Sequence, residues 1–379
     1  DFLYTFQIPW QQIEGRLQTS VIPNVLRTSS AADIIRVAAD YSTALFVSDS
    51  AGGFDVLEIF GTLNTHTRLT QAFVRNGGLQ IQHTGIDRII LRDPQRRMTL
   101  SGAELTDPLN LGPISLGIIA ESVTLPTSVT AAGLELNLRD SLVLTSTLST
   151  LDLNIRVLGD NQNITVTAPL TAANSIQLIA PDGTVTLPAG NQFSTHTAVI
   201  KARQLQVPGD ALNTAVSVLT IVTSENSAGG LQLVNDRDLL LTRTTDADHL
   251  VQLDGSLAAV FSSLTWVAAV SAEWAENVFD GALNPYAVLV TGSLAVSLPA
   301  FSAEDEDQLA ADGLLRSRAG SLQFVADELE FTGGAGSVRA PGSLSIRSAT
   351  SNWNYRLGTS AESAAGEQFV GNNGRSSLD

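Results

Sequence analysis

The stretch Gly320–Ser348 reads GSLQFVADELEFTGGAGSVRAPGSLSIRS and contains one structural phrase twice. Apolar and polar residues alternate through Leu322–Val325, two acidic residues interrupt the pattern, and alternation resumes through Leu329–Phe331. Strict alternation places every second side chain on the same face of a strand. The stretch therefore predicts two short strands that each bury one face, separated by a polar corner.

The phrase restarts after the glycines. Val338 and Ala340 take the place of the first strand, and Leu344–Ile346 forms the second. Two short strands per coil with one apolar face predict a β-solenoid. From about Gly78 onward such pairs recur, with successive first strands about 15–24 residues apart, which is the length that one coil with variable corners consumes.

We therefore expect an all-β chain folded as a single elongated parallel β-helix. The alternative is a β-sandwich of two sheets, because a sandwich also gives short strands at regular intervals.

Three regions are expected along the chain. Residues 1–77 form an irregular, β-rich cap or docking region, residues 78–349 form the solenoid, and residues 350–379 form a polar tail or a linker between subunits. Within the first region, Ser29–Tyr41 fits either a short helix or a strand, and we favour the strand because strand-like segments follow at turn-like intervals,.

One short helix is predicted near residues 302–313, where it would cover an edge of the solenoid. Ser302 suits the N-cap, Asp305 the N3 position and Gly313 the position after the last turn,. The acidic residues of the first turn would also interact favourably with the helix dipole.

Composition excludes several classes of function. The 379 residues carry a formal net charge of −17, which disfavours nucleic acid and anionic membrane surfaces as partners. Cysteine is absent, so disulfides and thiolate sites are excluded. No apolar run is long enough for a membrane-spanning helix,.

Lys201 is the only lysine, so at most one isopeptide bond of the pilus kind is possible. Because the sequence opens at Asp1 without a signal-peptide pattern, we expect a processed chain or an excerpt of a longer one,.

The sequence offers no catalytic, cofactor-binding or metal-binding motif. The four histidines lack metal-ligand spacing: His66, His83, His196 and His249,. The acidic run Glu304–Asp307 would suit calcium,. However, acids at a helix N-terminus are explained more simply by the helix dipole. We expect no cofactor, with calcium kept as the alternative.

A carbohydrate-cleaving β-helix is the enzymatic alternative. Such an enzyme would need two or three carboxylates, or a carboxylate and an arginine, on aligned coils. Four aspartates fall at corners of different coils: Asp140, Asp182, Asp236 and Asp254. Aspartate is also a common turn former, so the simpler interpretation is structural.

The solenoid phrase, as in Leu322–Phe331 and Leu134–Leu144, resembles the filamentous-haemagglutinin and giant-adhesin type of bacterial surface protein. In that family, turns of the pattern L-x-L-x-A-x-x-L-x-L build a right-handed parallel β-helix. The resemblance covers roughly residues 78–348 and implies export and a role in attachment or fibre building. It transfers no functional residue, because the recurring positions of the family are core positions. The sequence lacks the N-terminal secretion-domain signature expected of a whole adhesin of this type.

These observations predict a non-enzymatic, extracellular structural protein on a bacterial surface, part of a fibre or adhesin stalk. Its partners would be further copies or a covalent continuation of the chain, together with a host-surface or matrix ligand. The residues expected to take part in assembly are aromatic or apolar side chains near the two ends: Phe2, Tyr4, Phe6, Ile8, Trp353, Tyr355 and Phe369. The strand around Tyr4 would cap the first coil of its own chain or lie along a neighbouring subunit.

Overall fold

The computed structural model describes residues 3–6, 24–27, 34–48, 53–187, 193–207, 211–225, 230–242, 286–299, 309–327, 329–331, 336–350, 354–357 and 367–370. Within these ranges the chain forms strands and no helix, which confirms the predicted all-β class. The chain divides into two compact units, which are described separately. Unit 1 is Asp1–Leu142 with Ser146–Ile155, and unit 2 is Val143–Thr145 with Arg156–Asp379.

Unit 1 is built on a ladder of parallel strands. The ladder runs in the order β1–β3–β5–β9–β11–β13, and each strand pairs with the next coil of the chain. The strands of the unit, including the two that are divided between the units, are β1 (Leu3–Phe6), β2 (Asn24–Arg27), β3 (Ile34–Ala38), β4 (Leu45–Ser48), β5 (Val56–Phe60), β6 (His66–Leu69), β7 (Phe73–Asn76), β8 (Leu79–Thr84), β9 (Arg88–Ser101), β10 (Leu109–Asn110), β11 (Ser115–Thr124), β12 (Ser128–Thr130), β13 (Gly133–Leu138), β14 (Leu142–Leu144) and β15 (Thr147–Val157).

Three strands within residues 1–77, β1, β3 and β5, belong to the same parallel ladder, while β2 and β4 pair in parallel with each other and β4 pairs with β8. Ile34–Ala38 is strand β3, so the strand interpretation of the surrounding stretch is confirmed. It pairs in register with β1 on one side and β5 on the other. The exception to parallel pairing is a hairpin insertion in which β7 pairs antiparallel with both β6 and β8.

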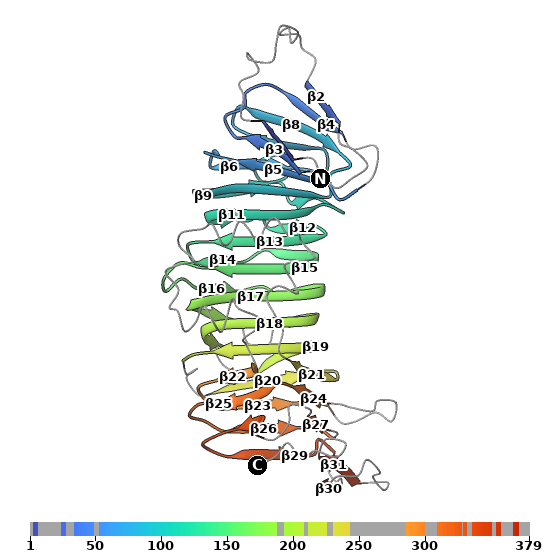
Figure 1. The fold of residues 1–379 in the computed structure, drawn as a ribbon, viewed down its shortest axis with the longest axis vertical. Helices are drawn as coiled ribbons and strands as arrows, with labels where there is room; N and C mark the ends of the chain where they lie inside the picture. Colours follow the sequence, from blue (N-terminus) through green and yellow to red (C-terminus); the bar gives the residue numbers. More distant parts are fainter. Residues whose placement is uncertain are drawn as a thin grey trace. The chain divides into compact units, whose positions relative to one another are not determined.

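The C-terminal part of unit 2 contains three ladders of parallel strands, which follow the parallel strands β16 to β19. The first ladder is β22–β25–β28, the second is β20–β23–β26–β29 and the third is β21–β24–β27–β31. Figure 1 shows the strands of the second ladder one beneath another. The strands of the unit are β16 (Ile164–Val166), β17 (Leu170–Thr186), β18 (Phe193–Gln206), β19 (Leu212–Thr223), β20 (Leu231–Asn235), β21 (Leu239–Thr242), β22 (Tyr286–Val290), β23 (Leu294–Ser297), β24 (Leu309–Asp312), β25 (Leu314–Ser317), β26 (Leu322–Val325), β27 (Leu329–Phe331), β28 (Val338–Arg339), β29 (Leu344–Arg347), β30 (Asn354–Leu357) and β31 (Glu367–Val370).

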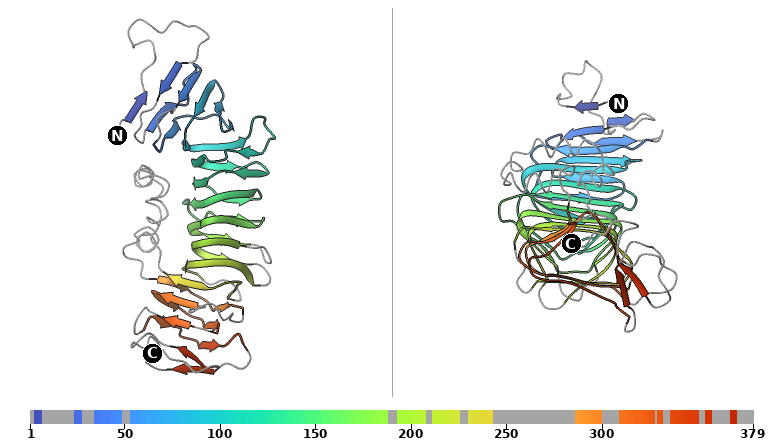
Figure 2. Two further views of the ribbon diagram at one scale, coloured as in Figure 1. Left: turned by 90° about the vertical axis from the view of Figure 1, so that its right-hand side faces the viewer. Right: turned by 60° about the horizontal axis from the view of Figure 1, so that its bottom comes forward.

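This arrangement confirms a parallel solenoid and corrects its expected geometry. In-register parallel pairing between coils is incompatible with the sandwich alternative, whose sheets would be antiparallel,. The expectation of two strands per coil is wrong in the C-terminal part of unit 2. There, β22, β23 and β24 make one coil and β25, β26 and β27 make the next. Figure 2 shows these strands, coloured orange to red, stacked edge to edge.

The expected register of the repeated phrase is also wrong. Leu322 pairs with Leu344, whereas Val338 pairs with Leu315 of the first ladder. The physical reason is that each coil has three sides, so one more strand than expected separates equivalent positions. The short strand β28 belongs to the additional side, so Leu344 and not Val338 reaches the position above Leu322.

Longer strands of unit 2 turn corners without losing their pairing. β17 and β18 pair over three segments that are separated by register shifts, one of them between Ala180 and Thr184. Pro181, Asp182 and Gly183 occupy that corner. A Cβ on Gly183 would lie 1.6 Å from the Gln162 carbonyl oxygen of the neighbouring coil, so only glycine allows this close stacking.

The prediction of a helix near residues 302–313 is wrong for the part of that stretch that the structure describes. Leu309–Asp312 is strand β24, while residues 300–308 lie outside the described residues. Leu309 and Ala311 are 0% and 2% exposed and occupy inward positions of the third ladder. Their burial in the core therefore outweighs the helix propensity of a Leu-Ala-Ala sequence.

Columns of apolar side chains fill the interior of each unit. In unit 1, Ile35, Leu57, Ile89, Leu116 and Leu134 occupy one column, and each is at most 1% exposed. In unit 2, a corresponding column is Leu231, Leu294 and Leu322. Each column continues because a parallel register repeats the same face on every coil.

The opposite face of the main sheet is buried as well. In unit 1, Arg88 and Glu135 are both fully buried, and their Nη2 and Oε2 atoms lie 2.8 Å apart. Asn137 Nδ2 donates to Glu135 Oε1 at 2.8 Å. In unit 2, Lys201 is also fully buried. Burial of both faces is the usual condition of a parallel sheet.

Candidate functional site

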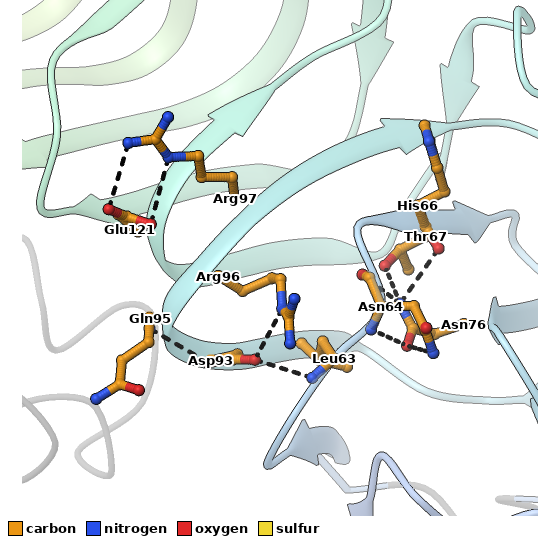
Figure 3. A network of polar contacts seen from close by, with 10 residues as sticks. All are labelled: Leu63, Asn64, His66, Thr67, Asn76, Asp93, Gln95, Arg96, Arg97 and Glu121. Atoms are coloured by element: carbon orange, nitrogen blue, oxygen red, sulfur yellow. Dashed lines mark hydrogen bonds and ion pairs between the residues drawn. The ribbon is translucent and has the colours of Figure 1, made fainter.

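A row of charged groups crosses three coils of unit 1 at one corner. Arg97 lies on β9, Glu121 on β11 and Asp140 follows β13. The Arg97 guanidinium lies 3.4 Å from Glu121 Oε2 and 3.4 Å from Asp140 Oδ2. Figure 3 shows Arg97 with both Glu121 oxygens. Because the Arg97 side chain is 71% exposed, this network contributes little to stability but is accessible to a ligand.

A second corner row lies in unit 2. Arg203 Nη1 donates to Asn161 Oδ1 at 3.0 Å, and Arg203 Nε lies 3.7 Å from Glu225 Oε2. Burial raises the pKa of Asp182, the neighbouring Asp160 carboxylate raises it further, and Arg203 lowers it. A carboxyl group with a raised pKa beside a second carboxylate and an arginine is a combination used in acid–base catalysis.

Two of the four predicted corner aspartates thus join clusters, each within its own unit: Asp140 in unit 1 and Asp182 in unit 2. Asp236 forms an ion pair with the adjacent Arg237 at 3.3 Å. Asp254 lies outside the described residues. The partners of these aspartates were missed from the sequence, because Arg97 and Asp140 are 43 residues apart and meet only once the coil register is known.

Other polar clusters support the backbone. The Asn76 side chain is fully buried, and its Nδ2 donates to the Asn64 carbonyl at 3.0 Å and to Thr67 Oγ1 at 2.7 Å. Its Oδ1 accepts from the Asn64 N–H at 2.7 Å. Asp93 Oδ2 accepts from the Leu63 N–H at 2.9 Å. These groups satisfy one another around the hairpin insertion, as Figure 3 shows, and we assign them a structural role.

The histidines are separate from these rows. The His66 ring points away from the Asn76 amide in Figure 3, and His196 is exposed on β18. His83 is 3% exposed on β8. Burial lowers the pKa of His83 to about 4, an effect that the Thr70 backbone offsets only in part. His249 and the acidic run at residues 304–307 lie outside the described residues. The described ranges contain no group of three or more potential metal ligands.

Four of the seven residues predicted to take part in assembly are described, and all four lie on strands. Tyr4 and Phe6 are on β1, which pairs with β3 of the same chain. Tyr355 is on β30 and Phe369 on β31, and these two strands pair with each other. β31 also continues the third ladder beside β27. Phe2, Ile8 and Trp353 lie outside the described residues.

The last strand of the second ladder forms an open edge. β29 pairs with β26, and no strand of the described residues pairs with its other side. Leu344 is 39% exposed, whereas Leu322, Leu294 and Leu231 in the same column are 0%, 1% and 5% exposed. The apolar column therefore reaches a surface at β29 instead of ending on a polar residue.

Comparison of the chain with protein-family models, curated proteins and solved structures found no match. Among the described residues, no helix has the length and apolar character needed to cross a bilayer.

Proposed function

We propose that the chain is a non-enzymatic structural protein that extends by stacking further coils on its open edge. In this role it forms part of an extracellular fibre or adhesin stalk on a bacterial surface. The observation that carries the proposal is β29, where both the backbone edge and the Leu344 column are left uncovered by the described chain. The resemblance of the phrase to giant adhesins supports the same role.

The driving force for stacking has two parts. An unpaired strand edge presents N–H and C=O groups that another strand can satisfy. An added coil would also remove Leu344 and Ile346, which share an inward face on β29, from water,. Other edge strands commonly carry charges or proline that block such pairing. On β29, Arg347 is the only charged residue.

Sedimentation velocity over a range of protein concentrations tests the proposal. We expect the wild-type chain to self-associate. Leu344→Lys should shift it towards monomer, because an added coil would bury the lysine ammonium group on β29. Val143→Lys is the matched control, since Val143 is 61% exposed on β14. Deletion of residues 1–8 is also expected to reduce assembly. A chain that stays monomeric at all concentrations would contradict the proposal.

A carbohydrate-active enzyme is the second candidate function. The specific observation in its favour is Asp182, whose pKa is raised beside Asp160 and Arg203. Incubation with acidic and neutral glycans, followed by detection of new reducing ends, tests this role. Asp236→Asn is the control for Asp182→Asn, because Asp236 is a corner aspartate whose described ion pair is with its chain neighbour Arg237. Turnover that is lost in Asp182→Asn and kept in Asp236→Asn would replace the structural proposal.

A further inference from the structure

A repeated Gly-Ser-Leu phrase holds successive coils of the second ladder together. It occurs at Gly292–Leu294, Gly320–Leu322 and Gly342–Leu344, directly before or at the start of β23, β26 and β29. In each case the leucine occupies the apolar column and the serine sits at the corner. The phrase therefore marks both the register and the side of the coil.

The serines form a hydrogen-bonded ladder, which we call the serine ladder. The N–H of Ser321 donates to Ser293 Oγ at 3.0 Å, and the N–H of Ser343 donates to Ser321 Oγ at 2.9 Å. In the opposite direction, the Leu294 N–H donates to the Ser321 carbonyl at 2.9 Å, and the Leu322 N–H donates to the Ser343 carbonyl at 2.9 Å. Each coil thus makes the same two bonds with the next.

The glycine of the phrase is required by this close stacking. A Cβ on Gly320 would lie 2.3 Å from the Ser293 nitrogen, and one on Gly342 would lie 2.8 Å from the Gly320 carbonyl oxygen. Backbone atoms cannot move aside as a flexible side chain can. A strand that joins the ladder must therefore carry glycine at this position.

The described residues leave the same two bonds unformed at the end of the ladder. Within the described residues, no backbone N–H donates to Ser343 Oγ and no carbonyl accepts from the Leu344 N–H. Leu344, the last member of the column, is 39% exposed. A further coil would need glycine at the corner, serine next to it and leucine in the column.

The sequence contains the phrase a fourth time, at Gly255–Leu257, followed by Ala258, Ala259 and Val260. This copy lies outside the described residues. Strands β20 and β23, which precede and follow it along the chain, pair directly with each other. The second ladder therefore has no place for the fourth phrase between them, and its other free position is the open edge of β29.

We propose that the edge of β29 binds residues 255–260 of a second copy of this chain as an added parallel strand. In this complex the Ser256 N–H donates to Ser343 Oγ, the Leu344 N–H donates to the Ser256 carbonyl and Leu257 covers Leu344. This inference rests on the proposed function and names the segment that joins the open edge.

A labelled peptide tests the interaction. A fluorescein-labelled peptide of residues 254–261 (DGSLAAVF) is titrated with the full chain and followed by fluorescence anisotropy. Between the described coils, Ser343 Oγ donates to Ser321 Oγ at 3.0 Å. We expect binding to weaken about fivefold when Ser256 is replaced by alanine, because the corresponding bond between Ser256 Oγ and Ser343 Oγ is lost while the two backbone bonds remain. Replacement of Gly255 by alanine is expected to abolish binding. Leu344→Lys in the chain should weaken binding at least about tenfold, and Val143→Lys should leave it unchanged. Equal binding of all peptides would overturn the proposal.

Self-association of the chain itself distinguishes this inference from the proposed function. We expect Leu257→Ser and Leu344→Lys each to reduce association in sedimentation velocity. Association that is lost in Leu344→Lys but unchanged in Leu257→Ser would overturn the assignment of residues 255–260 and leave the proposed function standing. Peptide binding by a wild-type chain that stays monomeric at every concentration would overturn the second-copy assignment and the proposed self-assembly together.

Discussion

Truncation of two leucines in one column measures whether the last coil is open. Leu322 and Leu344 pair with each other across β26 and β29, but they are 0% and 39% exposed. Leu322→Ala removes a fully buried side chain and leaves a cavity, which costs about 3 kcal/mol. In a single chain, Leu344→Ala creates no enclosed cavity and should cost about 1 kcal/mol or less.

Stacking of a second copy on β29 would change the relative cost of the two truncations. When another coil covers β29, Leu344 becomes a buried member of its column, and truncation should then approach the cost at Leu322. We therefore expect the difference in unfolding free energy between wild type and Leu344→Ala to increase as protein concentration rises. The difference for Leu322→Ala should stay constant.

Urea unfolding, followed by circular dichroism at low and high protein concentration, provides the measurement. Leu294→Ala is the matched internal control, because Leu294 is 1% exposed in the same column. If Leu344→Ala costs as much as Leu322→Ala in dilute solution, then the edge of β29 is already covered within one chain. That result would refute the reasoning.

Four further predictions follow from the described contacts. The pKa of His83 is about 4 in the folded chain against 6.5 in the unfolded one, so the unfolded state binds more protons between these values and stability falls as pH drops from 6.5 towards 4. At pH 4.5 the loss is about 2.5 kcal/mol, and we expect His83→Phe to remove it in urea unfolding while His196→Phe keeps it. Arg88→Met should destabilise unit 1 by about 3 kcal/mol, because it leaves the Glu135 charge buried and unpaired, whereas Arg88→Met with Glu135→Leu should recover most of that loss in the same assay,. Gly320→Ala should lower the free energy of unfolding by about 2 kcal/mol, while Gly78→Ala, where a Cβ meets no atom within 4 Å, should change it little. The pKa of Asp182, measured by NMR titration of its carboxyl carbon, should rise further in Arg203→Met and fall in Asp160→Asn, because Arg203 lowers it and Asp160 raises it; the opposite signs would contradict the described cluster.

The fold class could be predicted because the inward positions alternate in sequence. Leu322 and Phe324 on β26 and Leu329 and Phe331 on β27 are at most 3% exposed, as their alternation indicated. The number of sides per coil could not be predicted in the same way. β22 buries Ala287 to Val290 consecutively, so that side of the coil shows no alternation.

Leu309 to Asp312 illustrate a second limit of sequence patterns. Leucine and alanine favour helices, and a residue spacing of two fits a strand equally well. Only the neighbouring coils decide the outcome, because Leu239 and Leu329 stack on Leu309 from either side.

The candidate sites were harder to predict than the core. Asp140 and Asp182 are recognisable as corner residues, but Arg97 and Arg203 look like ordinary surface arginines until the register places Arg97 near Asp140 and Arg203 near Asp182. The buried pair Arg88 and Glu135 gives no signal at all, because polar residues on the second face of a strand normally indicate exposure,. The serine ladder did leave a readable signal, the recurrence of Gly-Ser-Leu.

Hydrogen exchange of the Leu344 amide tests the open edge most directly. In the described coils, the N–H of each equivalent leucine donates to the serine carbonyl of the next coil. We predict that the Leu344 amide exchanges rapidly in dilute solution and becomes protected when the chain is concentrated enough to associate, while the Leu322 amide is protected throughout. Equal protection of the Leu344 amide at every concentration would contradict a solenoid that recruits further strands at β29.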